Sequence, residues 1–91
     1  MTNDRATGLD DVLAEIKMRL EPFRKGDAPI TPETDITRDL SIDSLAVMDM
    51  IMELEDRFDV SIPLNVVAEI KTVGELASTI GRIRQTAQQG A

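Results

Sequence analysis

The residues that could take part in chemistry are Asp43 and Ser44, which lie at the junction between an irregular stretch and a helical pattern. A serine nucleophile needs a general base and an oxyanion site. The chain has no histidine and no Gly-x-Ser-x-Gly motif, and nothing in the sequence places Lys71 beside Ser44. We therefore expect no catalysis. Two interpretations stay open: a first-turn serine without a role, and an exposed serine that another enzyme modifies.

The composition restricts the protein to a few classes. The 91 residues include 17 acidic and 10 basic side chains, a formal net charge of −7, and no cysteine or histidine. Disulfides and thiolate or imidazole metal sites are therefore excluded, and the negative charge opposes binding to nucleic acids or anionic membranes. No apolar run is long enough to span a bilayer, and residues 1–5 lack the pattern of a secretory signal. We expect a small, monomeric, cytoplasmic domain with basic protein partners.

The elements that must position Ser44 are helices. Apolar residues at helical spacing predict a first helix over residues 9–21, which Pro22 ends. Residues 22–42 have no sustained periodicity, and a loop of this length is uncommon in a compact domain. Three of its apolar residues can pin it onto a helical core: Ile30, Ile36 and Leu40.

A second helix is predicted over residues 44–58. Asp43 is a good N-cap residue, because its carboxylate can accept hydrogen bonds from backbone N–H groups of the first turn. Ile42 and Val47 have the spacing of a hydrophobic staple, which fixes the angle at which the chain enters the helix. This arrangement leaves Ser44 facing outward at the helix tip.

A short third helix is predicted to begin near Pro63 and to end near Ile70, and Thr72 with Glu75 forms the capping-box pattern of a last helix. The predicted fold class is all-α, a small four-helix bundle with a long first loop and a short third helix. The expected domain organisation is a flexible N-terminus at 1–8, a folded domain at 9–84 and a flexible tail at 85–91.

The predicted second helix has two apolar faces when its residues are placed about 100° apart on a helical wheel. One face suits the core and contains Val47, Met50, Ile51, Leu54 and Phe58. The opposite face carries Leu45, Met48 and Met52 among acidic residues. Residues 43–59 include six acids and one base, so most of the excess negative charge lies here. This face is either a solvated surface or a docking surface for a basic partner with an apolar spot.

Alternate polar residues from Asp35 to Asp43 resemble the first ligands of a calcium-binding loop. That motif also needs glycine at its sixth position and glutamate at its twelfth. Leu40 and Ala46 occupy these positions. An EF-hand is therefore excluded, weak divalent binding stays open, and no dedicated metal site is expected.

The tripeptide Asp43-Ser44-Leu45 resembles the signature of the acyl carrier protein family. The resemblance includes Leu40, residues 53–58, Ile62-Pro63 and residues 70–76, and it covers most of the chain. It implies a four-helix fold with a short third helix. It also implies that Ser44, flanked by Asp43 and Leu45, receives 4′-phosphopantetheine from coenzyme A through a magnesium-dependent transferase. The thiol of this arm would hold an acyl group as a thioester, so the chain would be a non-catalytic carrier.

The resemblance makes the second helix a recognition helix. The expected partners are the phosphopantetheinyl transferase and acyl-transferring, synthase or ligase enzymes with basic docking patches. The residues expected to dock them are Leu45, Met48, Asp49, Met52, Glu55 and Asp56. A cargo cavity is expected between the second helix and the later helices, lined by Val47, Ile51, Leu54 and Ile70.

Three departures from the family pattern indicate a specialised, stand-alone carrier. Ser41 replaces a frequent glycine, Ala46 replaces a frequent acid, and residues 64–69 contain a single carboxylate. We therefore expect a carrier in fatty-acid, lipid or polyketide biosynthesis, with cargo and pathway unassigned. The alternatives are a peptidyl or aminoacyl carrier and an unmodified helical interaction module.

Overall fold

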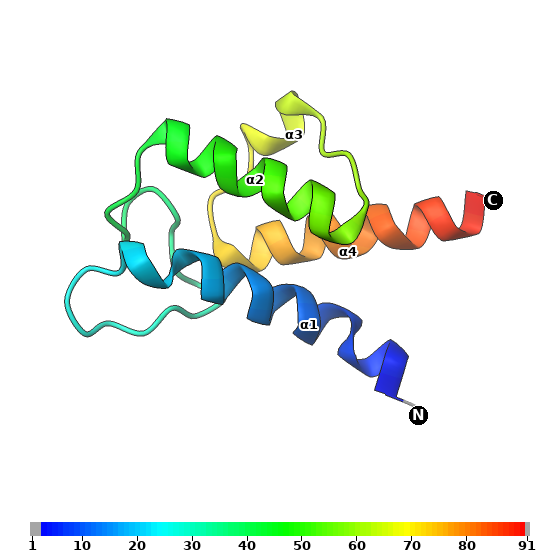
Figure 1. Ribbon diagram of the computed structural model, residues 1–91, viewed down its shortest axis with the longest axis horizontal. Helices are drawn as coiled ribbons and strands as arrows, with labels where there is room; N and C mark the ends of the chain where they lie inside the picture. Colours follow the sequence, from blue (N-terminus) through cyan, green and yellow to red (C-terminus); the bar gives the residue numbers. More distant parts are fainter. Residues whose placement is uncertain (1–2, 91) are drawn as a thin grey trace.

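The computed structural model describes the backbone of residues 3–90 and the side chains of residues 11–85. The elements in chain order are α1 (Asn3–Leu20), a 3-10 helix η1 (Glu21–Phe23), α2 (Ser44–Phe58), α3 (Leu64–Val67) and α4 (Val73–Gly90). Figure 1 shows how they are arranged, with a long loop between α1 and α2. The part of the chain that is described contains no β-strand, only two isolated bridges. The all-α, four-helix prediction is confirmed.

The helix bounds differ from the prediction mainly at the two ends of the chain. Helix α1 begins at Asn3 rather than near residue 9, and α4 ends at Gly90 rather than near Ile83. Both added stretches are polar, so no apolar stripe in the sequence marked them. Residues 1, 2 and 91 of the predicted flexible ends lie outside the described residues, and the boundaries of the folded domain at 9–84 stay a prediction.

Helix α3 is shorter than predicted, because the chain leaves α-helical geometry after Val67. The N–H of Glu69 donates to the carbonyl of Val66 at 3.0 Å, and the N–H of Ile70 donates to the carbonyl of Val67 at 3.1 Å. These i to i+3 bonds make tight turns instead of a longer helix. The short third helix of the prediction is therefore a single turn followed by a turn segment.

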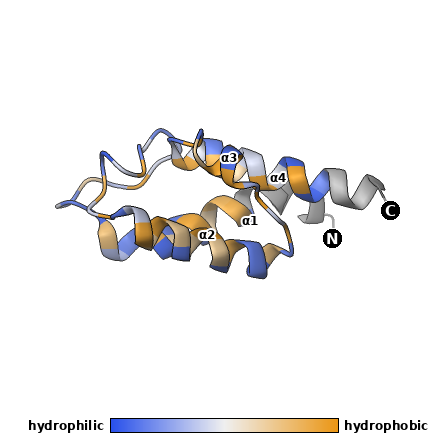
Figure 2. Ribbon diagram, turned by 90° about the horizontal axis from the view of Figure 1, so that it is seen from above, coloured by the Kyte–Doolittle hydropathy of each residue, from blue (hydrophilic) through white to orange (hydrophobic). Residues whose placement is uncertain are grey.

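The hydrophobic core lies between the helices and under the loop. Each long helix contributes residues at three- and four-residue spacing, which places them on one face. Figure 2 shows apolar colour on the faces that the helices turn toward one another. The buried core residues are Val12, Ile16 and Leu20 of α1, Met50, Ile51, Leu54 and Phe58 of α2, Val73, Leu76, Ala77 and Ile80 of α4, and Val60 and Ile62 between α2 and α3.

The long loop is part of the fold, because the three apolar residues predicted to anchor it on the core are all buried: Ile30, Ile36 and Leu40. Backbone hydrogen bonds also tie it to the start of α4. The N–H of Gly74 donates to the carbonyl of Pro32 at 2.8 Å, and the N–H of Ile36 donates to the carbonyl of Lys71 at 2.9 Å. A loop of this length is therefore compatible with a compact domain.

Candidate functional site

Ser44 is the first residue of α2, and its side chain is exposed. Asp43 precedes it in an extended conformation and caps the helix as predicted. One carboxylate oxygen of Asp43, Oδ1, accepts a hydrogen bond from the N–H of Ala46 at 2.9 Å, and its carbonyl accepts from the N–H of Val47 at 3.0 Å. These two bonds fix the first turn, so the Ser44 hydroxyl is presented at a defined helix end.

The chain that enters α2 is anchored on the protein. Leu40 is buried, and the N–H of Ser41 donates to the carbonyl of Phe23 at 2.7 Å. Ile42 and Val47, the predicted staple pair, are half-buried and both pack against the core. Ser44 therefore stands on a supported turn although its own side chain faces solvent.

The outward face of α2 holds the predicted docking residues. Leu45 is 72% exposed and Met52 is 60% exposed, so two large apolar side chains of α2 face solvent. Asp49 and Asp56 are exposed as well, while Met48 is half-buried. The structure thus brings five of the predicted residues to one side of the helix, and their docking role stays a prediction.

Glu55, the sixth predicted docking residue, has a structural contact that sequence reasoning missed. Its carboxylate oxygen Oε2 accepts a hydrogen bond from the N–H of Ile62 at 2.8 Å. This bond ties the segment before α3 to α2. No sequence signal marks such a contact, because it joins a helix side chain to the backbone of a later loop.

A second missed contact lies on the other flank of α2. The guanidinium of Arg19, on α1, pairs with Glu15 at 2.7 Å and also with Glu53 of α2. Arg57 of α2 lies 3.7 Å from Glu15. These ion pairs connect the acidic side of α2 to α1, so part of its charge is already balanced within the protein.

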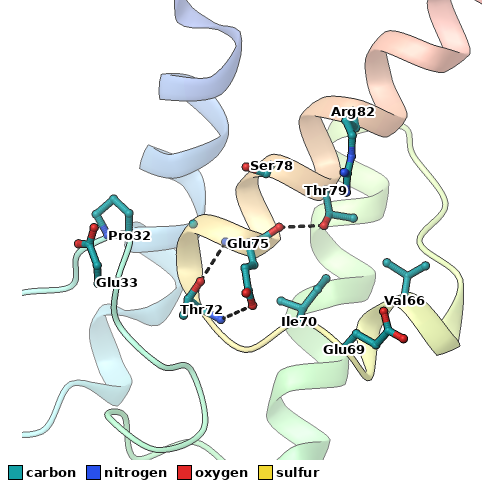
Figure 3. Close-up of a pocket in the computed structure, with 11 residues that line it drawn as sticks. Pro32, Glu33, Val66, Glu69, Ile70, Thr72, Glu75, Ser78, Thr79 and Arg82 are labelled. Carbon is teal, nitrogen blue, oxygen red and sulfur yellow. Dashed lines mark hydrogen bonds between the residues drawn. The ribbon is translucent and has the colours of Figure 1, made fainter.

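The residues expected to line a cargo cavity all belong to the core or pack against it. Ile51 and Leu54 are buried in the core, and Val47 and Ile70 are half-buried against it. The described residues form a cleft of about 770 Å³, which Figure 3 shows between the loop, α3 and α4. Of the expected set only Ile70 lines this cleft, so the cargo cavity stays a prediction. The lining residues are Pro32, Glu33, Val66, Glu69, Ile70, Thr72, Gly74, Glu75, Ser78, Thr79 and Arg82.

Glu75 fixes the backbone between α3 and α4. Its Oε1 accepts a hydrogen bond from the N–H of Lys71 at 2.7 Å. The same oxygen accepts from the N–H of Thr72 at 3.2 Å, and the N–H of Glu75 donates to the Thr72 hydroxyl at 3.1 Å (Figure 3). This is the predicted capping box. The bond from Lys71 and then that from Thr72 lower the pKa of Glu75 below its ordinary value of 4.5, because both favour the charged carboxylate.

The acidic residues of the loop make turns. Oδ1 of Asp35 accepts hydrogen bonds from the N–H of Thr37 at 3.2 Å and the N–H of Arg38 at 3.0 Å, and Asp39 accepts from the N–H of Asp35 at 2.8 Å. Among the residues whose placement is described, no group of three or more carboxylates is arranged to hold a metal ion. The same residues include no helix that is long and apolar enough to cross a bilayer.

The chain is similar to known proteins in both sequence and structure. A family model described as a phosphopantetheine attachment site matches residues 23–80. A probable acyl carrier protein from Caulobacter vibrioides is 50% identical over 58 residues, 64% of this chain and 67% of that protein. A meromycolate extension acyl carrier protein from Mycolicibacterium aurum is 30% identical over 84 residues, 92% of this chain and 80% of that protein. A solved structure assigned as an acyl carrier protein of Mycobacterium tuberculosis is 32% identical, with a TM-score of 0.65, and the match covers 82% of this chain and 96% of that one.

Proposed function

Because the chain belongs to the acyl carrier proteins, the family with a phosphopantetheine attachment site, we propose that Ser44 is the residue that carries the group. Acyl carrier proteins hold 4′-phosphopantetheine covalently and are generally not catalysts themselves. The exposed Ser44 hydroxyl at the capped start of α2 is the observation that supports the assignment. Asp43 and Leu45 flank it and complete the attachment signature.

The residues around Ser44 suit a phosphodiester. The hydroxyl faces solvent, so a transferase can reach it. The first N–H groups of α2 and the positive end of its dipole lie at the same place, and they favour a negative group there. Asp43 is nearby and opposes a second negative charge, so the net stabilisation is modest. When bound, the group supplies a thiol that can hold an acyl chain as a thioester, which a chain without cysteine lacks.

The attachment step needs no catalytic residue of this chain. The Ser44 oxygen forms a bond to the phosphorus of coenzyme A that bears the pantetheine. The pyrophosphate bond breaks, and adenosine 3′,5′-bisphosphate leaves. The proton of the hydroxyl passes to a base on the transferase.

The names of the relatives support a class of cargo. Several mycobacterial relatives are named for meromycolate extension, which concerns lipid synthesis. This supports a specialised role for the present chain in fatty-acid, lipid or polyketide assembly. Enzymes with basic patches would dock on the outward face of α2, through Leu45, Met48 and Met52 with Asp49 and Asp56 at the edge.

Intact mass after incubation with coenzyme A and a broad-specificity phosphopantetheinyl transferase tests the proposal. We expect the whole chain to gain the mass of one phosphopantetheine, and Ser44→Ala to gain nothing. Ser41→Ala is the matched control, because Ser41 is exposed like Ser44 and lies three residues before it. This variant should be loaded like the wild-type chain. A mass gain that survives Ser44→Ala, or the absence of a gain in the wild-type chain, would contradict the assignment.

A further inference from the structure

Four charged side chains form a ladder between α1 and α2. Two of them lie one helical turn apart on α1, and two lie one turn apart on α2: Glu15 and Arg19, and Glu53 and Arg57. Arg19 pairs with Glu53 across the helices and, at 2.7 Å, with Glu15 of its own helix. Arg57 lies 3.7 Å from Glu15. The charges therefore alternate in sign along the ladder, and each has a neighbour of opposite charge.

The centre of the ladder is partly shielded from water. The side chain of Glu15 is 14% exposed and that of Arg19 is 23% exposed, whereas that of Glu53 is 61% exposed. Arg19 uses both Nε and Nη2 to hold one carboxylate oxygen of Glu15. Fully exposed ion pairs contribute little because water and salt screen them, and partly buried pairs are screened less. The centre of the ladder is therefore suited to hold the two helices together.

The same half of α2 is also held by α4. The guanidinium of Arg84, on α4, lies over the ring of Phe58 at 5.2 Å from its centroid, and that of Arg57 lies over the same ring at 5.2 Å. Phe58 itself is buried in the core. Figure 1 shows the end of α2 against α4. Charged side chains thus tie residues 53–58 to both neighbouring helices.

The first half of α2 is held differently. Among the residues that the structure describes, no ion pair joins residues 44–52 to another element. This half is held by the cap of Asp43 and by the apolar packing of Val47, Met50 and Ile51. Apolar packing is non-directional, whereas charged hydrogen bonds fix a distance and a direction. The two halves of α2 therefore differ in how firmly their position is set.

We propose that the ladder and the stack of Arg84 on Phe58 clamp the C-terminal half of α2, so that the helix opens from its Ser44 end. Residues 44–52 move away from the core, while residues 53–58 stay on α1 and α4. The use of this motion rests on the carrier function proposed above. It exposes Val47 and Ile51 next to the attachment serine and keeps the other end of the bundle closed.

Native-state hydrogen exchange, followed residue by residue by NMR on the whole chain without the attached group, tests the clamp. The backbone N–H groups of residues 54–58 should exchange at least about tenfold more slowly than those of residues 48–51, although both sets lie within α2. Arg19→Met removes the charge and keeps the aliphatic stem. It should speed exchange at residues 54–58 about tenfold, the scale of one lost charge-assisted hydrogen bond, and leave residues 48–51 within about twofold.

Two further variants separate the clamp from general destabilisation. Glu53→Gln keeps the size of the side chain and weakens only the pair between α1 and α2, so it should speed exchange at residues 54–58 about threefold, less than Arg19→Met because Glu53 is the more exposed partner. Arg24→Met is the matched control, because Arg24 pairs at 3.4 Å with Glu21 of η1, outside the ladder. It should change neither half.

Equal exchange in the two halves of the wild-type helix, or an effect of Arg19→Met spread evenly over α2, would overturn the inference. The exchange rates are measured without loading. A failure of the clamp is therefore distinct from a failure to modify Ser44.

Discussion

Replacement of Asp43 by alanine tests how the start of α2 is held. The variant loses the hydrogen bond at 2.9 Å between the carboxylate and the N–H of Ala46, while the backbone bond to Val47 can remain. Loss of an N-cap side chain of this kind costs about 1 kcal/mol. In a domain of this size 1 kcal/mol corresponds to about 4–8 °C in the unfolding midpoint. We therefore expect the midpoint of Asp43→Ala to fall by about 5 °C.

Thermal unfolding followed by far-ultraviolet circular dichroism measures this change. Asp43→Asn is the matched variant, because the amide oxygen can still accept from Ala46 and asparagine caps helices about as well as aspartate. It should lose less than half as much, the remainder being the loss of a negative charge near the helix dipole. An unchanged midpoint in Asp43→Ala would refute the cap as the support of the Ser44 turn. Equal losses in both variants would show that charge, rather than the hydrogen bond, holds it.

Two further predictions concern the start of α4, to which the loop is hydrogen-bonded. Gly74→Ala places a Cβ 3.0 Å from the carbonyl oxygen of Pro32. It should lower the free energy of unfolding, measured by denaturant titration, by about 1–3 kcal/mol. An unchanged free energy would show that the loop can shift freely. Glu75→Gln tests the pH dependence of stability. The N–H groups of Lys71 and Thr72 lower the pKa of Glu75 below 4.5 in the folded protein. The charge of Glu75 therefore stabilises the fold fully above pH 4.5, and this stabilisation is lost as the pH falls through the lower folded pKa. The free energy of unfolding of the variant should therefore be lower than that of the wild type by a constant amount near neutral pH, and this difference should close in acid. A difference that grows in acid would contradict a stabilising role of the charged Glu75 carboxylate.

The parts of the fold that could be predicted from the sequence are those with local signals. The bounds of α2 match the prediction of residues 44–58, because Asp43 marks its start and the apolar spacing continues to Phe58. The capping box of Thr72 and Glu75 was predicted for the same reason. A cap needs only residues three or four apart, so its chemistry is visible in a short stretch of sequence.

The contacts that could not be predicted join residues far apart in the chain. Arg19 and Glu53 are 34 residues apart, and Glu55 and Ile62 are brought together only because the chain turns after α2. The pattern of charges indicated an acidic face but not which acids are already paired. The cleft between the loop, α3 and α4 was missed because its lining residues come from segments far apart in the chain, which meet where the N–H of Gly74 donates to the carbonyl of Pro32.

The two faces of α2 differ in what a substitution would cost in stability. Met50, Ile51, Leu54 and Phe58 of the core face are buried in the same core as residues of α1, α4 and the loop, so a large-to-small substitution there leaves a cavity and costs about 2–5 kcal/mol. The outward apolar residues Leu45 and Met52 are mostly exposed, so changing them removes little buried surface. Substitutions on the outward face are therefore expected to leave the bundle intact. Glu55 is the exception, because its bond to Ile62 ties the segment before α3 to α2.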